Sequence, residues 1–264
     1  ESSGYCDFGK IRDFINDAGS ALSDCLYKNA GFTVSAIEQA CEALVCPDGC
    51  NFCSLQFYGS AQMGVALPII SDVDAAVMLK SPMSVKNSEC GFAMGSLGFN
   101  FERVPFLMAI SNFIRKGNPK SKTRLREAGP TGSRVSILTV KISPKSPSFD
   151  VVVCVCDADD NPLDNESRMI LESVNDTDYI LKCVECVACS AGIDPSVMCD
   201  AYKGALRIIK YWAFQRDVYG STFGFLGGGG WSIFLARVLC DFFRSDANDS
   251  FNSEIPATFL SQKF

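Results

Sequence analysis

The chain has 264 residues, enough for one large domain or two moderate ones, each with its own buried core. It contains no histidine, which excludes Ser-His-Asp triads, Cys-His pairs and histidine-ligated zinc as the source of catalysis. Its net charge of −6 would by itself count against a nucleic-acid partner. No apolar run reaches the length of about 18 residues that spans a bilayer, and no leader is evident, so we expect a soluble protein.

Taken in chain order, the pattern predicts helices, then a mixed block of strands and helices, then helices again. Apolar side chains recur at helical spacing in residues 10–44. Runs rich in β-branched residues predict strands at 54–60, 71–79, 134–143 and 149–157, with a helix at 104–116. Helical periodicity returns at 200–219 and 229–243. This order predicts an α+β protein.

The charges are unevenly distributed along the chain. Between Ile114 and Lys145, nine basic residues face a single acid, Glu127. This segment is either a solvated surface loop or a patch that faces RNA or a triphosphate. From Asp157 to Asp178 acids predominate, and we interpret that segment as an acidic loop that could dock basic partner proteins.

Fourteen cysteines without a secretion signal predict a reducing compartment. Two groups are closely spaced: Cys46-Cys50-Cys53 and Cys183-Cys186-Cys189. The second group lies in an apolar, helix-compatible stretch, where thiols serve as small hydrophobes. We therefore favour structural roles, and a zinc site remains an alternative only if the fold brings both groups together.

A set of carboxylates carries the strongest chemical signal. Asp72 and Asp74 alternate on one predicted strand, so both carboxylates point to the same side. Two adjacent acids repel each other, and a divalent cation such as Mg²⁺ between them would relieve that repulsion. Upstream, Gly59 and Ser60 follow a strand and can approach a phosphate closely. Downstream, Asp150 opens an apolar strand that could lie beside the first pair.

In that order, these residues resemble the signature of the polymerase-β nucleotidyltransferase superfamily. A second segment, Ala205 to Val238, resembles the central domain of eukaryotic poly(A) polymerases. The likeness rests on Lys210, Trp212, Tyr219, the block GFLGG and Trp231 with Ala236-Arg237, in that order. A pair of core helices joined by a Gly-rich turn would explain the apolar spacing but not this set of residues.

The resemblance implies a role for each matching position. Asp72, Asp74 and Asp150 would bind two Mg²⁺ ions, with Mn²⁺ as a substitute, and the ion on Asp150 would activate an RNA 3′-hydroxyl. Gly59 and Ser60 would hold the triphosphate, and Lys210 and Tyr219 would contact it. The implied nucleotide-binding set is Tyr58, Gly59, Ser60, Asn175, Lys210, Tyr219, Gly228 and Gly229.

The implied fold is a polymerase-β-like palm, a mixed sheet with flanking helices, plus a helical central domain. We expect N-terminal helices at 1–50 that pack with the central domain, a catalytic domain at 51–175, and an incomplete central domain at 176–264. The C-terminal RNA-binding domain of the family is not supplied by this sequence.

The implied activity is template-independent addition of AMP from ATP to RNA 3′ ends, in the nucleus, with subunits of a 3′-processing complex as partners. Cytoplasmic location is the alternative. Three departures from the family pattern leave base selectivity open: Phe214, Ser221 and Gly229. Another RNA terminal nucleotidyltransferase, such as one that prefers UTP, and a catalytically silent RNA-processing scaffold therefore remain as alternatives.

Overall fold

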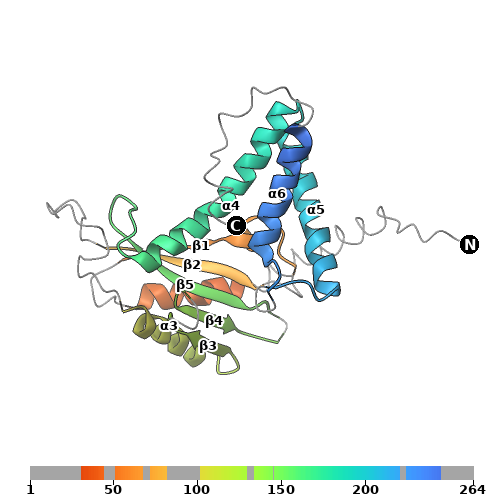
Figure 1. Ribbon diagram of the computed structural model, residues 1–264. Helices are drawn as coiled ribbons and strands as arrows, with labels where there is room; N and C mark the ends of the chain where they lie inside the picture. Colours follow the sequence, from red (N-terminus) through yellow and green to blue (C-terminus); the bar gives the residue numbers. More distant parts are fainter. Residues whose placement is uncertain are drawn as a thin grey trace, which may run out of the picture. The chain divides into compact units, whose positions relative to one another are not determined.

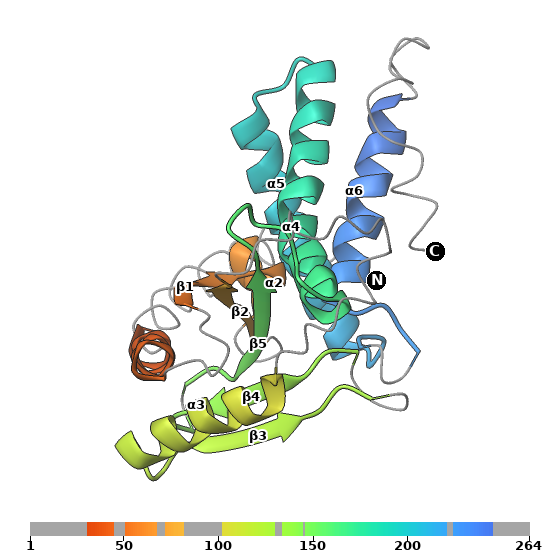
Figure 2. The same ribbon diagram turned by 90° about the vertical axis from the view of Figure 1, so that its left-hand side faces the viewer.

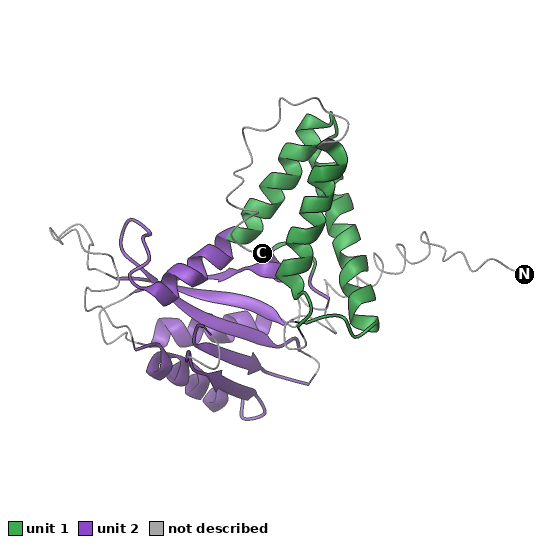
Figure 3. Ribbon diagram, viewed as in Figure 1, with its two compact units in different colours: residues 1–17, 63–65, 176–264 green, residues 18–62, 66–175 purple. Residues whose placement is uncertain are grey.

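The computed structural model describes residues 31–44, 51–67, 72–81, 102–129, 134–144, 146–220 and 224–244. The expectations for residues 1–30, for Cys46 and Cys50, and for Ser221 lie outside this range. The chain forms two compact units (Figure 3), and the main division falls between Asn175 and Asp176. Among the described residues, unit 1 comprises Met63–Val65 and the chain from Asp176, and unit 2 comprises the rest.

Unit 2 is built on a five-stranded mixed sheet of order β1-β2-β5-β4-β3 (Figure 1). The strands are β1 (Asn51–Phe57), β2 (Val73–Lys80), β3 (Lys122–Arg126), β4 (Ile137–Lys141) and β5 (Phe149–Cys156). The central strands β2 and β5 are parallel, and the other neighbours are antiparallel. The predicted α+β class with a mixed sheet is confirmed.

Each face of the sheet has its own apolar core. On one face, α3 (Arg103–Gly117) and the helical residues 31–43 cover the odd-numbered residues of β2 and β5, such as Val77 and Val153. On the other face, the start of α4 (Asn165–Ser190) packs Ile170 and Val174 against even-numbered residues, including Val152. Because both faces are covered, β5 is apolar at nearly every position. Figure 2 shows α3 running along β3 and β4.

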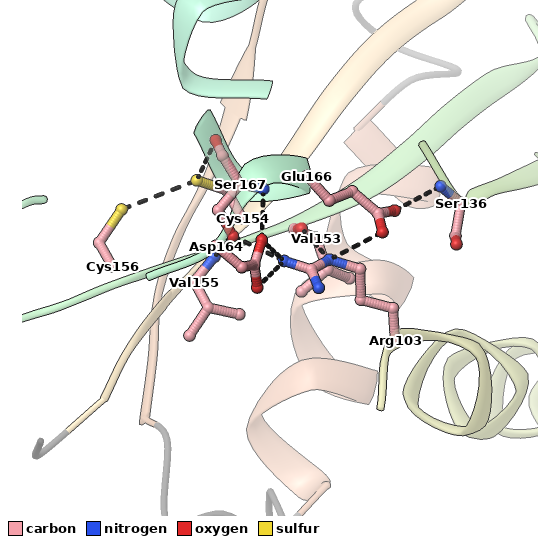
Figure 4. Close-up of polar contacts among 9 residues, drawn as sticks. All are labelled: Arg103, Ser136, Val153, Cys154, Val155, Cys156, Asp164, Glu166 and Ser167. Carbon is pink, nitrogen blue, oxygen red and sulfur yellow. Dashed lines mark hydrogen bonds and ion pairs between the residues drawn. The ribbon is translucent and has the colours of Figure 1, made fainter. Parts of the chain in front are cut away.

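A buried arginine closes the edge of β5 where the pairing with β4 ends at Val151. Arg103, 7% exposed, donates from Nε to the carbonyl of Val153 at 3.2 Å. Its Nη2 reaches both carboxylate oxygens of Asp164 at 2.7 Å and Ser167 Oγ at 2.6 Å (Figure 4). Ser167 Oγ in turn accepts from the amide of Val155 at 2.9 Å. Side chains from the starts of α3 and α4 thus satisfy backbone groups that no strand pairs.

Unit 1 is helical. It contains α5 (Pro195–Gln215), α6 (Gly228–Arg244) and the second half of α4. Helix α5 begins at an Asp194 cap, whose carboxylate accepts from the amide of Ser196, and Pro195 occupies its first turn. Tyr202 is buried and donates its hydroxyl to the carbonyl of Ser232 at 2.8 Å, which joins α5 to α6.

Two residues from an earlier part of the sequence complete the core of unit 1. Met63 and Val65 are buried in the cluster formed by α4, α5 and α6. They follow α2 (Gly59–Gln62), a single turn in unit 2. The chain therefore contributes to unit 1 at residues 63–65 and returns to unit 2 before it finally enters unit 1 at Asp176.

Two elements differ from the sequence-based expectation. The basic segment, for which a solvated loop and a patch facing RNA or a triphosphate were both left open, contains strand β3, which was not predicted and which pairs with β4. The acidic segment continues as a loop only to Asp164, because α4 begins at Asn165. The acids from Glu166 onwards lie on a helix whose Ile170 and Val174 face the core.

The described helix at 31–43 packs Ile37, Ala40 and Cys41 against the sheet of unit 2. We expected the N-terminal helices to pack with the central domain, and for this helix the packing is with the five-stranded sheet of unit 2 instead. Within the described parts of the chain, no helix is long and apolar enough to cross a membrane.

Candidate active site

Strand pairing in unit 2 brings two of the predicted aspartates side by side. Asp74 on β2 and Asp150 on β5 are direct partners in the parallel register, and Thr139 on β4 is the next residue in the same row. Asp72 comes directly before β2. Burial raises the pKa of the Asp72 carboxyl, and the charge of Asp150 raises it further. The sheet therefore gathers carboxylates whose charges repel one another.

The turn after β1 lies against Asp74. The amide of Tyr58 donates to the carbonyl of Asp74 at 3.1 Å. Gly59 has φ +61°, and a Cβ atom there would lie 3.1 Å from Asp74 Oδ2. Burial and, less strongly, the charges of Asp74 and Asp150 raise the pKa of the Tyr58 hydroxyl. The Gly-Ser turn and the carboxylates thus form one site.

We predict that Gly59→Ala and Gly64→Ala have similar effects on stability and different effects on activity. Both glycines have a positive φ, so each alanine should cost about 1–2 kcal/mol in the free energy of unfolding. A Cβ on Gly64 meets nothing within 4 Å, whereas one on Gly59 displaces Asp74 Oδ2. The activity that the resemblance implies, nucleotidyl transfer, should therefore fall only in Gly59→Ala. Urea denaturation and RNA primer extension measure the two effects, and equal activity in both variants would contradict the prediction.

Both carboxylate oxygens of Asp150 have partners that the sequence did not reveal. Thr139 Oγ1 donates to Oδ1 at 2.6 Å, and Arg126 Nη2 donates to Oδ2 at 2.7 Å. Arg126 lies on β3, the strand that was not predicted. Among the described residues, no three Asp, Glu or Cys side chains are grouped so that they could hold a metal ion.

A second set of predicted residues converges in unit 1. Lys210 on α5 is 1% exposed, and its Nζ donates to the carbonyl of Val65 at 3.2 Å. A Cβ on Gly228 would lie 3.1 Å from the hydroxyl of Tyr219 and 3.8 Å from Lys210 Nζ. Gly228 is the first residue of α6, whose early amides favour an anion. The ammonium of Lys210, the hydroxyl of Tyr219 and the N-terminus of α6 therefore lie together at Gly228, which has no side chain.

For the other predicted site residues, the described contacts give no specific indication of a binding role. Ser60 is half-buried in α2, and a Cβ on Gly229 would meet nothing within 4 Å. Asn175 is exposed on α4, and the structure records no hydrogen bond from its side chain to a described residue. Phe214, which departs from the family pattern, is 39% exposed.

The described cysteines do not form a zinc site. Cys183 is half-buried, and its pKa is raised by burial and by Cys240 and Cys186. Cys186 and Cys189 are exposed, so the interpretation as small hydrophobes fits only the first of the three. Cys53 is exposed on β1.

Comparison with known proteins supports the resemblance from several directions. Residues 201–253 match the family model described as the poly(A) polymerase central domain. Poly(A) polymerase PAPalpha of Candida albicans is 42% identical over 83 residues, which are 30% of this chain and 13% of that protein. Poly(A) polymerase PAPa of the same organism is 33% identical over 132 residues, 45% of this chain and 21% of that protein. The chain thus matches about a fifth or less of these relatives' length.

Solved structures with the same fold cover most of the chain. Terminal uridylyl transferase 4 from Trypanosoma brucei, with bound UTP and UMP, matches 88% of this chain and 59% of that one at a TM-score of 0.50 and 13% identity. The Cid1 poly(U) polymerase matches 85% of this chain and 53% of that one, also at 0.50, with 14% identity. These structures place the fold among the polymerase-β-like nucleotidyltransferases. The central-domain match and the sequence relatives show that the C-terminal part of the chain resembles the central domain of poly(A) polymerases.

Proposed function

We propose that the protein adds AMP from ATP to RNA 3′ ends without a template, as a polynucleotide adenylyltransferase. The observation that carries this proposal is the register of β2 and β5, which sets Asp74 beside Asp150, with Asp72 next to the pair. Gly59 lies against Asp74, as a turn that holds a triphosphate beside metal-binding carboxylates should. The relatives named poly(A) polymerases support ATP as the nucleotide.

The carboxylates suit a divalent cation. Burial and the nearby charge of Asp150 raise the pKa of the Asp72 carboxyl, and a cation held there would offset both effects. We propose that Asp72, Asp74 and Asp150 hold Mg²⁺, with Mn²⁺ as a substitute. When bound, the metal neutralises charge on the reacting phosphate and favours ionisation of the RNA 3′-hydroxyl. A Cid1 structure described with Mg and 3′-dATP bound supports this choice of cofactor.

The chain's own groups would bind and orient the nucleotide. In unit 2, the Gly59 backbone and the Ser60 hydroxyl would hold the triphosphate, with Tyr58 as the buried support of that turn. In unit 1, Lys210, Tyr219 and the first amides of α6, at Gly228 and Gly229, offer positive charge and donors to an anion. Asn175 would contact the nucleotide or the primer end from α4.

Lys210→Met should lower kcat/KM for ATP by about tenfold to a hundredfold, the usual loss for one charged hydrogen bond to phosphate. Arg207→Met is the matched control. Arg207 also lies on α5 and donates to a carbonyl of the same short segment, that of Gly64, but it is not buried. Steady-state primer extension at varied ATP measures both variants. Equal losses would indicate that the bonds to the 63–65 segment matter and that Lys210 has no special role at the phosphates.

The proposed activity is tested with a short oligo(A) primer, Mg²⁺ or Mn²⁺, and each of the four NTPs separately. Extension with ATP alone, absent in Asp72→Ala/Asp74→Ala, would support poly(A) addition. Preference for UTP would favour the alternative of a uridylyltransferase, which the departures at Phe214, Ser221 and Gly229 leave open. Failure with every NTP would favour a silent scaffold or dependence on partner subunits.

We further propose that the protein acts in the nucleus with subunits of an RNA 3′-processing complex. Support comes from the relative named nuclear poly(A) polymerase 2 of Arabidopsis thaliana, which is 38% identical over 63 residues. Immunofluorescence of the tagged full-length protein would test the location, and an exclusively cytoplasmic signal would overturn it.

A further inference from the structure

Arg126 reaches Asp150 across a neighbouring strand. It lies on β3, the last strand of the sheet order, and its partner in the β3–β4 ladder is Ile137. Arg124, two residues earlier on the same side of β3, stands in the row of Thr139 and Asp150. The Arg126 side chain therefore leans over β4 to make its 2.7 Å contact with Asp150 on β5.

The two ends of this ion pair differ in exposure. The Arg126 side chain is 45% exposed, whereas that of Asp150 is 14% exposed. Asp150 is further fixed by Thr139, which donates to its other oxygen. The carboxylate is thus held in place while the guanidinium has room to leave. An arginine stays protonated at any physiological pH, so only another charge can release it.

Arg126 binds Oδ2 of Asp150, one of the two oxygen atoms that a metal ion could use. A divalent ion needs a free lone pair on Asp150, and it would stand a few ångströms from a cationic guanidinium. The guanidinium and the metal ion repel each other. Either of them alone can offset the negative charge of Asp150 and the carboxylates beside it. Occupancy by one therefore disfavours the other.

We propose that Arg126 is a built-in counter-ion that holds Asp150 in the metal-free protein and must release it when the metal binds. This inference rests on the proposed role of Asp150 as a metal ligand. As a consequence, the site binds metal with lower affinity than it would without Arg126. Metal binding is also coupled to a movement of the Arg126 side chain on β3. Arg126 is a positioning residue in this scheme, because it acts through Asp150.

The test is Mn²⁺ binding without nucleotide or RNA, measured by the loss of the free-ion signal in electron paramagnetic resonance. Arg126→Gln should bind Mn²⁺ about tenfold more tightly than the natural protein, because both the competing bond and the repulsion are gone. Arg124→Gln is the matched control, with the same change of charge on the same side of the same strand. Its affinity should stay within about twofold of the natural value.

Unchanged or weaker Mn²⁺ binding in Arg126→Gln would overturn the proposal, and so would equal tightening in both variants, which would indicate a general charge effect. Thermal unfolding distinguishes the proposed counter-ion role of Arg126 from a purely structural role. Arg126→Gln should melt lower than the natural protein without metal and equally at saturating Mn²⁺, and a deficit that persists in metal contradicts the proposal. Primer extension by the natural protein tests the proposed function separately, since it can succeed whether or not Arg126 competes.

Discussion

Asp74→Asn is expected to lower ATP-dependent primer extension on the order of a thousandfold with little change in stability. The amide is nearly isosteric with the carboxylate, and the backbone carbonyl of Asp74 still accepts from the amide of Tyr58. The substitution removes a negative charge that would hold the metal ion beside the reacting phosphate. Asp150→Asn should lose activity to a similar extent, and it should also be less stable because it breaks the ion pair with Arg126.

Asp200→Asn is the matched control, since Asp200 is an exposed acid on α5 that undergoes the same chemical change. It should retain full activity. Gel analysis of primer length measures activity, and circular dichroism verifies that each variant is folded. An Asp74→Asn protein that keeps more than about a tenth of the natural rate would refute the two-metal assignment, because loss of a metal ligand removes several kcal/mol of transition-state stabilisation.

Arg103→Met is expected to destabilise the protein by about 3–5 kcal/mol, the usual cost of breaking a buried ion pair. The substitution leaves the Asp164 carboxylate, 19% exposed, without its cation, and it removes the donor to the Val153 carbonyl. Glu166 also loses its cation, which lies 3.7 Å away. The midpoint of urea denaturation measures the loss.

Two further variants test this prediction: one is a control at an exposed ion pair, and the other should restore part of the lost stability. Arg237→Met breaks an exposed pair with Asp241 on α6 and should cost less than about 1 kcal/mol. Arg103→Met/Asp164→Leu should recover part of the loss, because the Asp164 carboxylate is no longer left without its cation, although Glu166 still is. If Arg103→Met costs no more than Arg237→Met, the network does not hold the edge of β5.

The strands that the sequence predicted best are those buried on both faces. The apolar runs of β2 and β5 are unmistakable, because each residue meets a core above or below the sheet. Strand β3 has exposed Lys122, Arg124 and Arg126 on one side, and its pairing with β4 makes it a strand. Helix α4 was partly read as a loop, because its acids are visible in the sequence and its narrow apolar stripe is not.

The same distinction applies to the site. The meeting of Asp74 and Asp150 could be predicted, because acids at the starts of two apolar strands meet where those strands are parallel neighbours. The contacts of Asp150 with Thr139 and Arg126 depend on the register across three strands, which no local pattern encodes. A sequence search for alternating basic residues opposite a β-branched strand would have suggested β3, but not which arginine reaches the carboxylate.

The contribution of Met63 and Val65 to the helical core has a consequence for how the protein can be divided. A gene split between Asn175 and Asp176 would seem to yield two modular halves. The second half would then lack two buried core side chains that only the first half encodes. During synthesis those side chains leave the ribosome before α5 and α6 do, so the helical unit can complete its interior only after the rest of the chain has emerged.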